Sequence, residues 1–166
     1  MSAGRARAEA AVTTFYVLGL GLWASGLLLA GAIVAPVVFR HVPAPTSGDA
    51  MALVFRRIDS LSLGIAVFLV ACEGTLATLR RELKRQDIVR MVMLALMVSG
   101  ALALALYFTP HIAALHEAGI VRDGSPGGQQ MESLHHGASR IGSCICILAV
   151  ASAFAQVSRT RVRESS

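Results

Sequence analysis

The chain has 166 residues, of which 55% are hydrophobic, and its mean hydropathy is +0.64. This composition is more apolar than that of an ordinary soluble domain, so we interpret the chain as an integral membrane protein. The net charge of +5 would suggest nucleic acid in a soluble protein, but flanking basic residues explain it in a membrane protein, and we expect no nucleic-acid partner.

The first predicted element is a long apolar helix. No residue from Ala10 to Phe39 carries a formal charge, and about 20 such residues cross a hydrocarbon core roughly 30 Å thick. A cleaved signal peptide has an apolar run of only about 7–15 residues, so we expect a retained span at about residues 11–39, preceded by a cytoplasmic N-terminus over residues 1–10. Pro36 should kink or end this helix near its outer end.

The next segment combines turn residues with a short helical pattern. The stretch "HVPAPTSGD" favours a turn, and Asp49 at its end is a candidate helix N-cap. Apolar residues then recur at helical spacing: Met51, Val54, Phe55 and Ile58. We therefore expect a short interfacial helix in the first outer loop, leading into the second span.

Three further apolar segments complete the fold. They predict spans at about residues 60–80, 88–110 and 136–158, followed by a cytoplasmic tail over residues 159–166. The short charged connection "RRELKRQD" predicts that spans two and three form an antiparallel hairpin. The fold class is all-α, a single membrane domain of four transmembrane helices over residues 11–158, and no internal repeat is evident in the sequence.

The distribution of basic residues orients this bundle. Ten lie on the side of the termini (Arg5, Arg7, Arg80, Arg81, Lys84, Arg85, Arg90, Arg159, Arg161 and Arg163) and five on the other side (Arg40, Arg56, Arg57, Arg122 and Arg140). Because cytoplasmic loops are enriched in arginine and lysine, we expect an inner-membrane protein with both termini in the cytoplasm.

All the histidines map to the outer side in this topology: His41, His111, His116, His135 and His136. Imidazoles bind copper and zinc, so together they are candidate metal ligands. However, His111 and His116 are five positions apart and the other pair is adjacent, so neither pair faces one ligand from one helix. We predict no cofactor, and a metal ion or haem held by several segments remains an alternative.

Polar residues of the fourth span lie opposite a bulky apolar stripe. They predict an outward-facing polar pocket, with these residues on its walls: His116, His135, His136, Ser139 and Arg140. No phosphate loop, nucleophile elbow, HExxH or CxxC is present, so we expect no enzyme and assign no catalytic residue.

Glu73 is the only carboxylate within a predicted span, and its helix face should point into the bundle. It could be protonated, hydrogen-bonded to a neighbouring helix, or reached by the long side chain of Arg80 or Arg81. A proton or ion pathway through Glu73 also remains open.

Small residues four positions apart suggest close approach of helix backbones in lipid. They serve either packing inside the bundle or contact with a second copy or another subunit of a membrane complex: Gly21, Ser25, Gly26, Ala30, Ala138 and Gly142.

Four stretches together resemble a known family: "GAIVAPVVFRHVP", "AMALVFRRIDSL", "TPHIAALH" and "LHHGASRI". They are similar to the bacterial four-helix proteins grouped as domain of unknown function 4149, related to animal transmembrane protein 205, over roughly residues 19–157. The resemblance implies the four-span fold but no established activity. It also implies recurring positions: Pro36, Phe39, Phe55, Arg56, His116, His135 or His136, and Ser139. The glycine-rich insert "DGSPGGQQ" and the doubled histidine depart from the family, which leaves open which histidine aligns.

Copper-resistance membrane proteins are a second, weaker resemblance, resting on outward histidines. We therefore predict a small multi-pass membrane protein of unknown biochemical activity. Handling of metal ions or protons, haem binding, and a structural role in a membrane complex are the alternatives.

Overall fold

The computed structural model describes residues 3–80, 84–121 and 123–164, with side chains described up to residue 158. The elements follow in the order α1 (Ala3–Leu28), the π-helix η1 (Leu29–Val34), α2 (Ala35–His41), α3 (Thr46–Arg80), α4 (Arg85–Ala103), the π-helix η2 (Leu104–Phe108), α5 (Thr109–Glu117) and α6 (Pro126–Glu164). The described residues form no strand, and four helical stretches are long and apolar enough to cross a membrane. The predicted all-α, four-span fold is confirmed.

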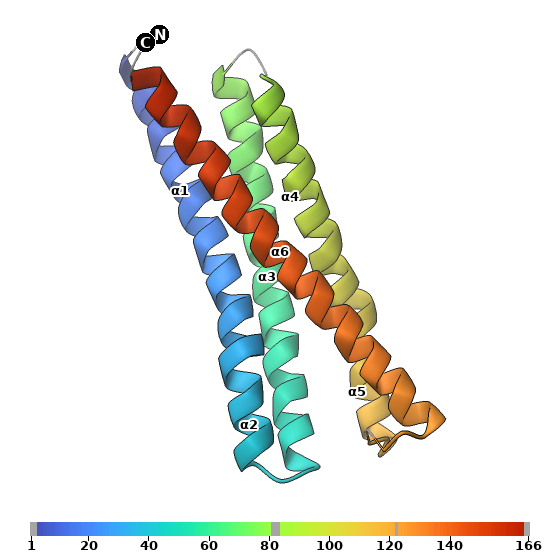
Figure 1. Ribbon diagram of the computed structural model, residues 1–166. Coiled ribbons are helices and arrows are strands. Elements are labelled where there is room, and N and C mark those ends of the chain that lie inside the picture. Colours follow the sequence, from blue (N-terminus) through green and yellow to red (C-terminus); the bar gives the residue numbers. More distant parts are fainter. Residues whose placement is uncertain (1–2, 81–83, 122, 165–166) are drawn as a thin grey trace.

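The helices form a ring in which α1 and α4 each contact both α3 and α6. The start of α1, the end of α3, the start of α4 and the end of α6 lie at one end of the bundle, and the connections α2–α3 and α5–α6 lie at the opposite end (Figure 1). We call these the terminal end and the loop end. The chain therefore consists of two hairpins: hairpin 1 comprises α1, η1, α2 and α3, and hairpin 2 comprises α4, η2, α5 and α6.

A proline follows each π-helix. Pro36 is the second residue of α2, and Pro110 is the second residue of α5. Proline has no N–H to donate to the carbonyl one turn earlier, and the wider π turn accommodates the displaced backbone. Pro36 therefore changes the helix type without ending the helix, which continues to His41.

Helix α3 runs without a break for 35 residues, a length of about 52 Å at 1.5 Å per residue. The segment that we predicted as a separate interfacial helix forms its first turns. No glycine or proline occurs between Asp49 and Ser60, so nothing interrupts the backbone hydrogen bonds where we expected a boundary. Since the hydrocarbon core is about 30 Å thick, α3 extends well beyond it.

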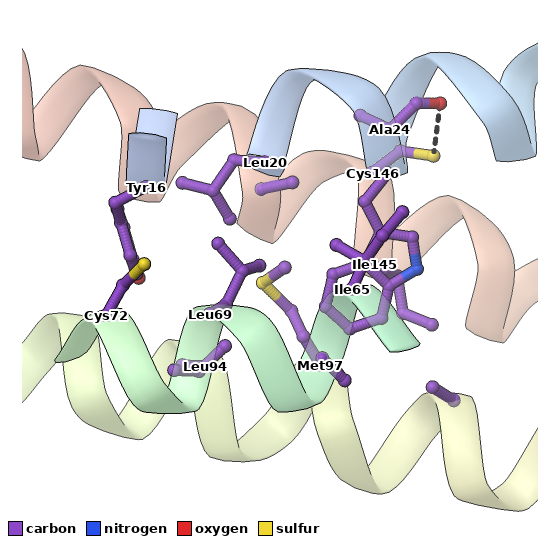
Figure 2. Packing of buried hydrophobic residues seen from close by; sticks show 14 of the residues in the cluster. Tyr16, Leu20, Ala24, Ile65, Leu69, Cys72, Leu94, Met97, Ile145 and Cys146 are labelled. Carbon is purple, nitrogen blue, oxygen red and sulfur yellow. Dashed lines mark hydrogen bonds between the residues drawn. The ribbon is translucent and has the colours of Figure 1, made fainter. Parts of the chain in front are cut away.

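The middle of the bundle is an apolar core drawn from all four long helices. Leu20, Leu69, Met97 and Ile145 are at most 2% exposed and converge there (Figure 2). A Cβ at Gly19 would lie 2.9 Å from Leu69 Cδ2, so glycine allows α1 to approach α3 closely. Apolar residues also cover the outside of the bundle, including Leu22, Val67, Leu96 and Ile147, as expected for a surface in lipid.

The small residues that we expected at close helix contacts differ in burial and in their neighbours. A Cβ at Gly21, Gly26 or Gly142 would meet no heavy atom within 4 Å, so these glycines do not provide close helix contacts within the described chain. Ser25 is exposed, Ala30 is buried and Ala138 is half-buried. Contact with a second copy through these residues stays a prediction.

The loop before α6 is organised by local hydrogen bonds. The Ser125 amide donates to Asp123 Oδ1 at 3.0 Å, and the Gly128 amide donates to Ser125 Oγ at 3.1 Å. Ser125 therefore caps the start of α6. Hydrogen bonds from the hydroxyl and amide of Ser125 hold the pKa of Asp123 below its usual range.

Candidate functional site: a buried charge cluster

A group of buried polar side chains lies at the terminal end of the bundle. We call it the charge cluster, and its members come from all four long helices: Glu9, Thr13, Glu73, Arg80, Asp87, Arg90 and Gln156. Asp87 and Gln156 are 0% exposed and Arg90 is 2% exposed. Charged groups this deeply buried require partners, because their desolvation is costly.

Arg90 is the centre of the cluster. Its guanidinium donates two hydrogen bonds to the Glu73 carboxylate, from Nε to Oε2 at 3.0 Å and from Nη2 to Oε1 at 2.5 Å. Nη1 donates to Gln156 Oε1 at 2.5 Å, and Nη2 lies 3.2 Å from Asp87 Oδ1. Arginine suits this position because its planar fork of donors matches a carboxylate. Arg90 thereby joins its own helix α4 to α3 and α6.

Helix α1 joins the cluster through two contacts. The Gln156 amide donates from Nε2 to Thr13 Oγ1 at 3.0 Å. The Arg90 guanidinium carbon also lies 5.7 Å from the centroid of the Tyr16 ring, within the range of a cation–π interaction. One arginine thus connects, directly or through Gln156, every long helix.

Arg80 forms the edge of the cluster nearer the chain ends. Its Nε donates to Glu9 Oε1 and its Nη1 donates to Asp87 Oδ1, both at 2.8 Å. Asp87 also accepts the Lys84 amide at 3.0 Å, which caps the start of α4. Nearby, Arg5 Nε donates to the Leu79 carbonyl at 2.8 Å and satisfies the C-terminal end of α3.

The position of Glu73 inside the bundle was predicted, but its partner was not. We had left open protonation, a hydrogen bond to a neighbouring helix, and contact with Arg80 or Arg81. The partner is Arg90 on the neighbouring helix α4, while Arg80 pairs with Glu9 and Asp87, and Arg81 lies outside the described residues. The sequence contained a usable signal. Glu73 and Arg90 are at similar distances from the turn between α3 and α4, so an antiparallel hairpin places them side by side.

At the loop end, His116 makes the clearest contact between helices. Its Nε2 lies 3.2 Å from Asp49 Oδ1, and its ring occupies the space where Gly48 lacks a Cβ. His136 Nε2 lies 3.7 Å from Glu132 Oε1, but both residues are on α6 and the His136 side chain is 70% exposed. His116 therefore joins α5 to α3, whereas His136 contacts its own helix.

The other residues of the predicted pocket and metal site are dispersed. His41, His111, Ser139 and Arg140 are exposed, and His135 is half-buried. Across the described chain, no three His, Cys, Asp or Glu side chains are placed to hold one metal ion. The outward pocket and the metal site both stay predictions.

Asp59 is a buried carboxylate in the part of α3 that we predicted as an interfacial helix. It is 9% exposed because α3 continues into the bundle, and Thr109 at the start of α5 lies near its carboxylate. Its Oδ2 is buried and has no hydrogen-bond partner among the described residues. Asp59 and Glu73 thus place one buried carboxylate toward each end of α3.

Residues 18–120 match the family model for a domain of unknown function, DUF4149. The chain belongs to this family. The matched region includes Asp59, Glu73, Asp87 and Arg90, and it ends before α6, which carries Gln156. No curated protein and no solved structure matches the chain, and a relation to transmembrane protein 205 remains an expectation.

Proposed function

We propose that this DUF4149 protein is a non-enzymatic structural protein of the inner membrane, with both termini in the cytoplasm. In this role the charge cluster clamps the two hairpins together on the cytoplasmic side, and the loop end is available for contacts with other components of a membrane complex. Its constant partner is the lipid bilayer, and no nucleic acid is involved.

The observation that carries this proposal is the set of hydrogen bonds that the buried Arg90 guanidinium donates to Glu73, Asp87 and Gln156. Removing one partner of a buried ion pair costs about 3–5 kcal/mol, because the other charge is left buried and unpaired. The cluster therefore favours one arrangement of the helices over alternatives with the same apolar pattern. That property suits a scaffold, whose helices must keep fixed positions.

Exposed basic residues support the cytoplasmic placement of the terminal end. Arg7, Lys84 and Arg85 are exposed there, beside the buried cluster. Basic residues in short loops remain on the cytoplasmic side during insertion and interact with anionic lipid headgroups.

The clamp is tested with Arg90→Met, which keeps an unbranched side chain and removes the guanidinium. Cys72 is 8% exposed and adjoins Glu73, so it is a natural probe of this end of the bundle. We expect a soluble maleimide to label Cys72 faster in Arg90→Met than in the native protein, measured by peptide-resolved mass spectrometry. Arg85→Met is the control, because Arg85 is exposed on the same helix. Equal labelling of Cys72 in the two variants contradicts the clamp.

The proposal includes no resident metal or haem. It is supported by the dispersal of His41, His111 and His136, all exposed, over three helices. Elemental analysis and an absorbance spectrum of the purified protein test this point. Stoichiometric metal or a haem absorption band contradicts it and favours a metal-handling role.

Proton handling is a second candidate function, favoured by the buried Oδ2 of Asp59, which has no hydrogen-bond partner in the described part of the chain. A buried ionisable residue within a span often marks a proton or ion path. Liposomes that contain the protein and a pH-sensitive dye test this candidate. Proton uptake that Asp59→Asn abolishes supports proton handling, and uptake equal to that of protein-free liposomes excludes it.

A further inference from the structure

The two hairpins share one plan. Each begins with a long helix, continues through a π-helix into a short helix with proline at its second position, and returns through one uninterrupted long helix. Both begin at the terminal end and turn at the loop end (Figure 1). Repeats with this orientation are related by an axis along the membrane normal.

The pattern of buried residues follows the same plan. When Pro36 is aligned with Pro110, the buried residues Thr13, Tyr16, Leu20 and Trp23 of α1 correspond to Asp87, Arg90, Leu94 and Met97 of α4, which are also buried. When Met51 is aligned with Met131, the buried residues Ile65, Leu69 and Leu76 of α3 correspond to Ile145, Ala149 and Gln156 of α6, which are again buried. The residue types differ, which explains why the sequence shows no repeat.

The two hairpins meet at two interfaces that should be equivalent, but they differ at the loop end. At the first, α3 packs on α5: Thr109 lies near Asp59, and His116 Nε2 lies 3.2 Å from Asp49 Oδ1. At the second, the equivalent elements would be α6 and α2, but the loop-end half of α6 lies beside α5 and away from α2 (Figure 1). There the structure shows no extensive contact among the described residues, and α2 packs on η1 and α3 instead.

Residues of this second interface are uncovered where their counterparts are buried. Ser139 corresponds to the buried Asp59 and is exposed. Phe39 is 50% exposed, whereas its counterpart Ala113 is 8% exposed. Gly142 corresponds to the buried Ser62, and a Cβ at Gly142 would meet no atom of the described residues within 4 Å. The corresponding residues Ala35, Ser139 and Gly142 are all small, which would permit a close approach of the two helices.

The elements beside this interface differ in how firmly they are held. Helix α6 packs closely on η2 within hairpin 2, because a Cβ at Gly137 would lie 2.5 Å from Phe108 Cε1. Helix α2 is connected to α1 only through the π-helix η1, and π-helical turns often occur at functional sites. Movement of α2 therefore disturbs fewer contacts than movement of α6.

We propose that the protein has a second conformation in which α2 closes on the loop-end half of α6, bringing Ala35 against Ser139 as Thr109 meets Asp59 in the other interface. The bend occurs at η1. The structure described here is then the open form, in which α2 and the loop-end half of α6 make no extensive contact among the described residues.

Cysteine cross-linking in native membranes tests this closure. The background has Cys72, Cys144 and Cys146 replaced by alanine. The first test pair is Ala35→Cys with Ser139→Cys. The second is Val42→Cys with Gln129→Cys, because Val42 corresponds to His116 and Gln129 corresponds to Asp49 in the other interface. The control pair is Val37→Cys with Ser139→Cys, because Val37 lies about 200° around the helix from Ala35.

After mild oxidation with copper phenanthroline, intramolecular disulfides are measured by mass spectrometry of the digested monomer. We expect both test pairs to accumulate disulfide faster than the control, since cross-linking traps even a minor state populated at about 0.1–10%. Folding of each variant is checked by thermal unfolding in detergent. If one test pair does not fold, the other decides. Rates equal to the control in the folded test pairs overturn the proposal without affecting the clamp at the terminal end.

Discussion

Gly48 illustrates how a single missing side chain determines a contact between helices. It lies in the first turn of α3, where the His116 ring from α5 fills the space beside its backbone. This placement allows His116 to reach Asp49 on the same turn. By contrast, Gly21 faces open space, so the two glycines should respond differently to the same change.

Gly48→Ala should destabilise the protein, because its Cβ would overlap the His116 ring and displace it from Asp49. Overpacking of this kind costs about 1–3 kcal/mol. Gly21→Ala should be neutral, or stabilising by up to about 1 kcal/mol from helix propensity. The free energy of unfolding in detergent measures both effects. Equal values for the two variants would contradict the close contact between Gly48 and His116.

The charge cluster shows what could and could not be predicted for single residues. Glu73 was expected inside the bundle because a lone carboxylate in an apolar span must avoid lipid. Arg90 was counted with the cytoplasmic basic residues, because basic residues near helix ends normally face water. Gln156 gave no signal, since the sequence does not reveal which face of α6 meets α4.

At the scale of elements, the amphipathic first turns of α3 resemble a separate interfacial helix, although α3 is one continuous helix. Its first turns carry exposed Arg56 and Arg57 beside the buried Met51, which is the pattern of an interfacial helix. The same pattern arises when a spanning helix extends beyond the hydrocarbon core, as α3 does. The sequence alone does not distinguish a separate interfacial helix from an extended spanning helix, because each of them buries one face.

Ser60→Pro tests the continuity of α3. Ser60 is exposed, and its hydroxyl donates to the Arg56 carbonyl at 3.0 Å. Proline at this interior position removes a backbone hydrogen bond and clashes with the preceding turn, which costs about 3 kcal/mol or more. Ser60→Ala should change stability little and is the control. If proline is tolerated as well as alanine in the unfolding measurement, α3 contains a break at this point.

For the whole molecule, four spans and an all-helical fold could be predicted because each span is long enough and apolar enough on its own. The ring order of the helices and the crossing of α6 from α1 toward α5 could not, because they depend on side-chain contacts between distant segments (Figure 1). The outward pocket was inferred from one helix face. Ser139 and Arg140 are exposed, and the pocket stays a prediction because one helix face does not define the other walls.

The proposed topology makes a prediction for the whole chain. A reporter fused after Ser166 should be active only in its cytoplasmic form, and one inserted after Gly124, in the loop before α6, only in its external form. The expectation follows from the excess of basic residues at the terminal end. The opposite result at both sites would invert the molecule and place the charge cluster on the outer side.

The coupling between Glu73 and Arg90 tests the clamp most directly. The measurement is a double-mutant cycle of Glu73→Gln, Arg90→Met and their combination, scored by the free energy of unfolding in detergent or bicelles. Each single change should cost about 3–5 kcal/mol, because it leaves a buried charge without its partner. The double variant should lose less than the sum of the two, since neither charge remains. Strictly additive losses would contradict the conclusion that this ion pair holds the hairpins together.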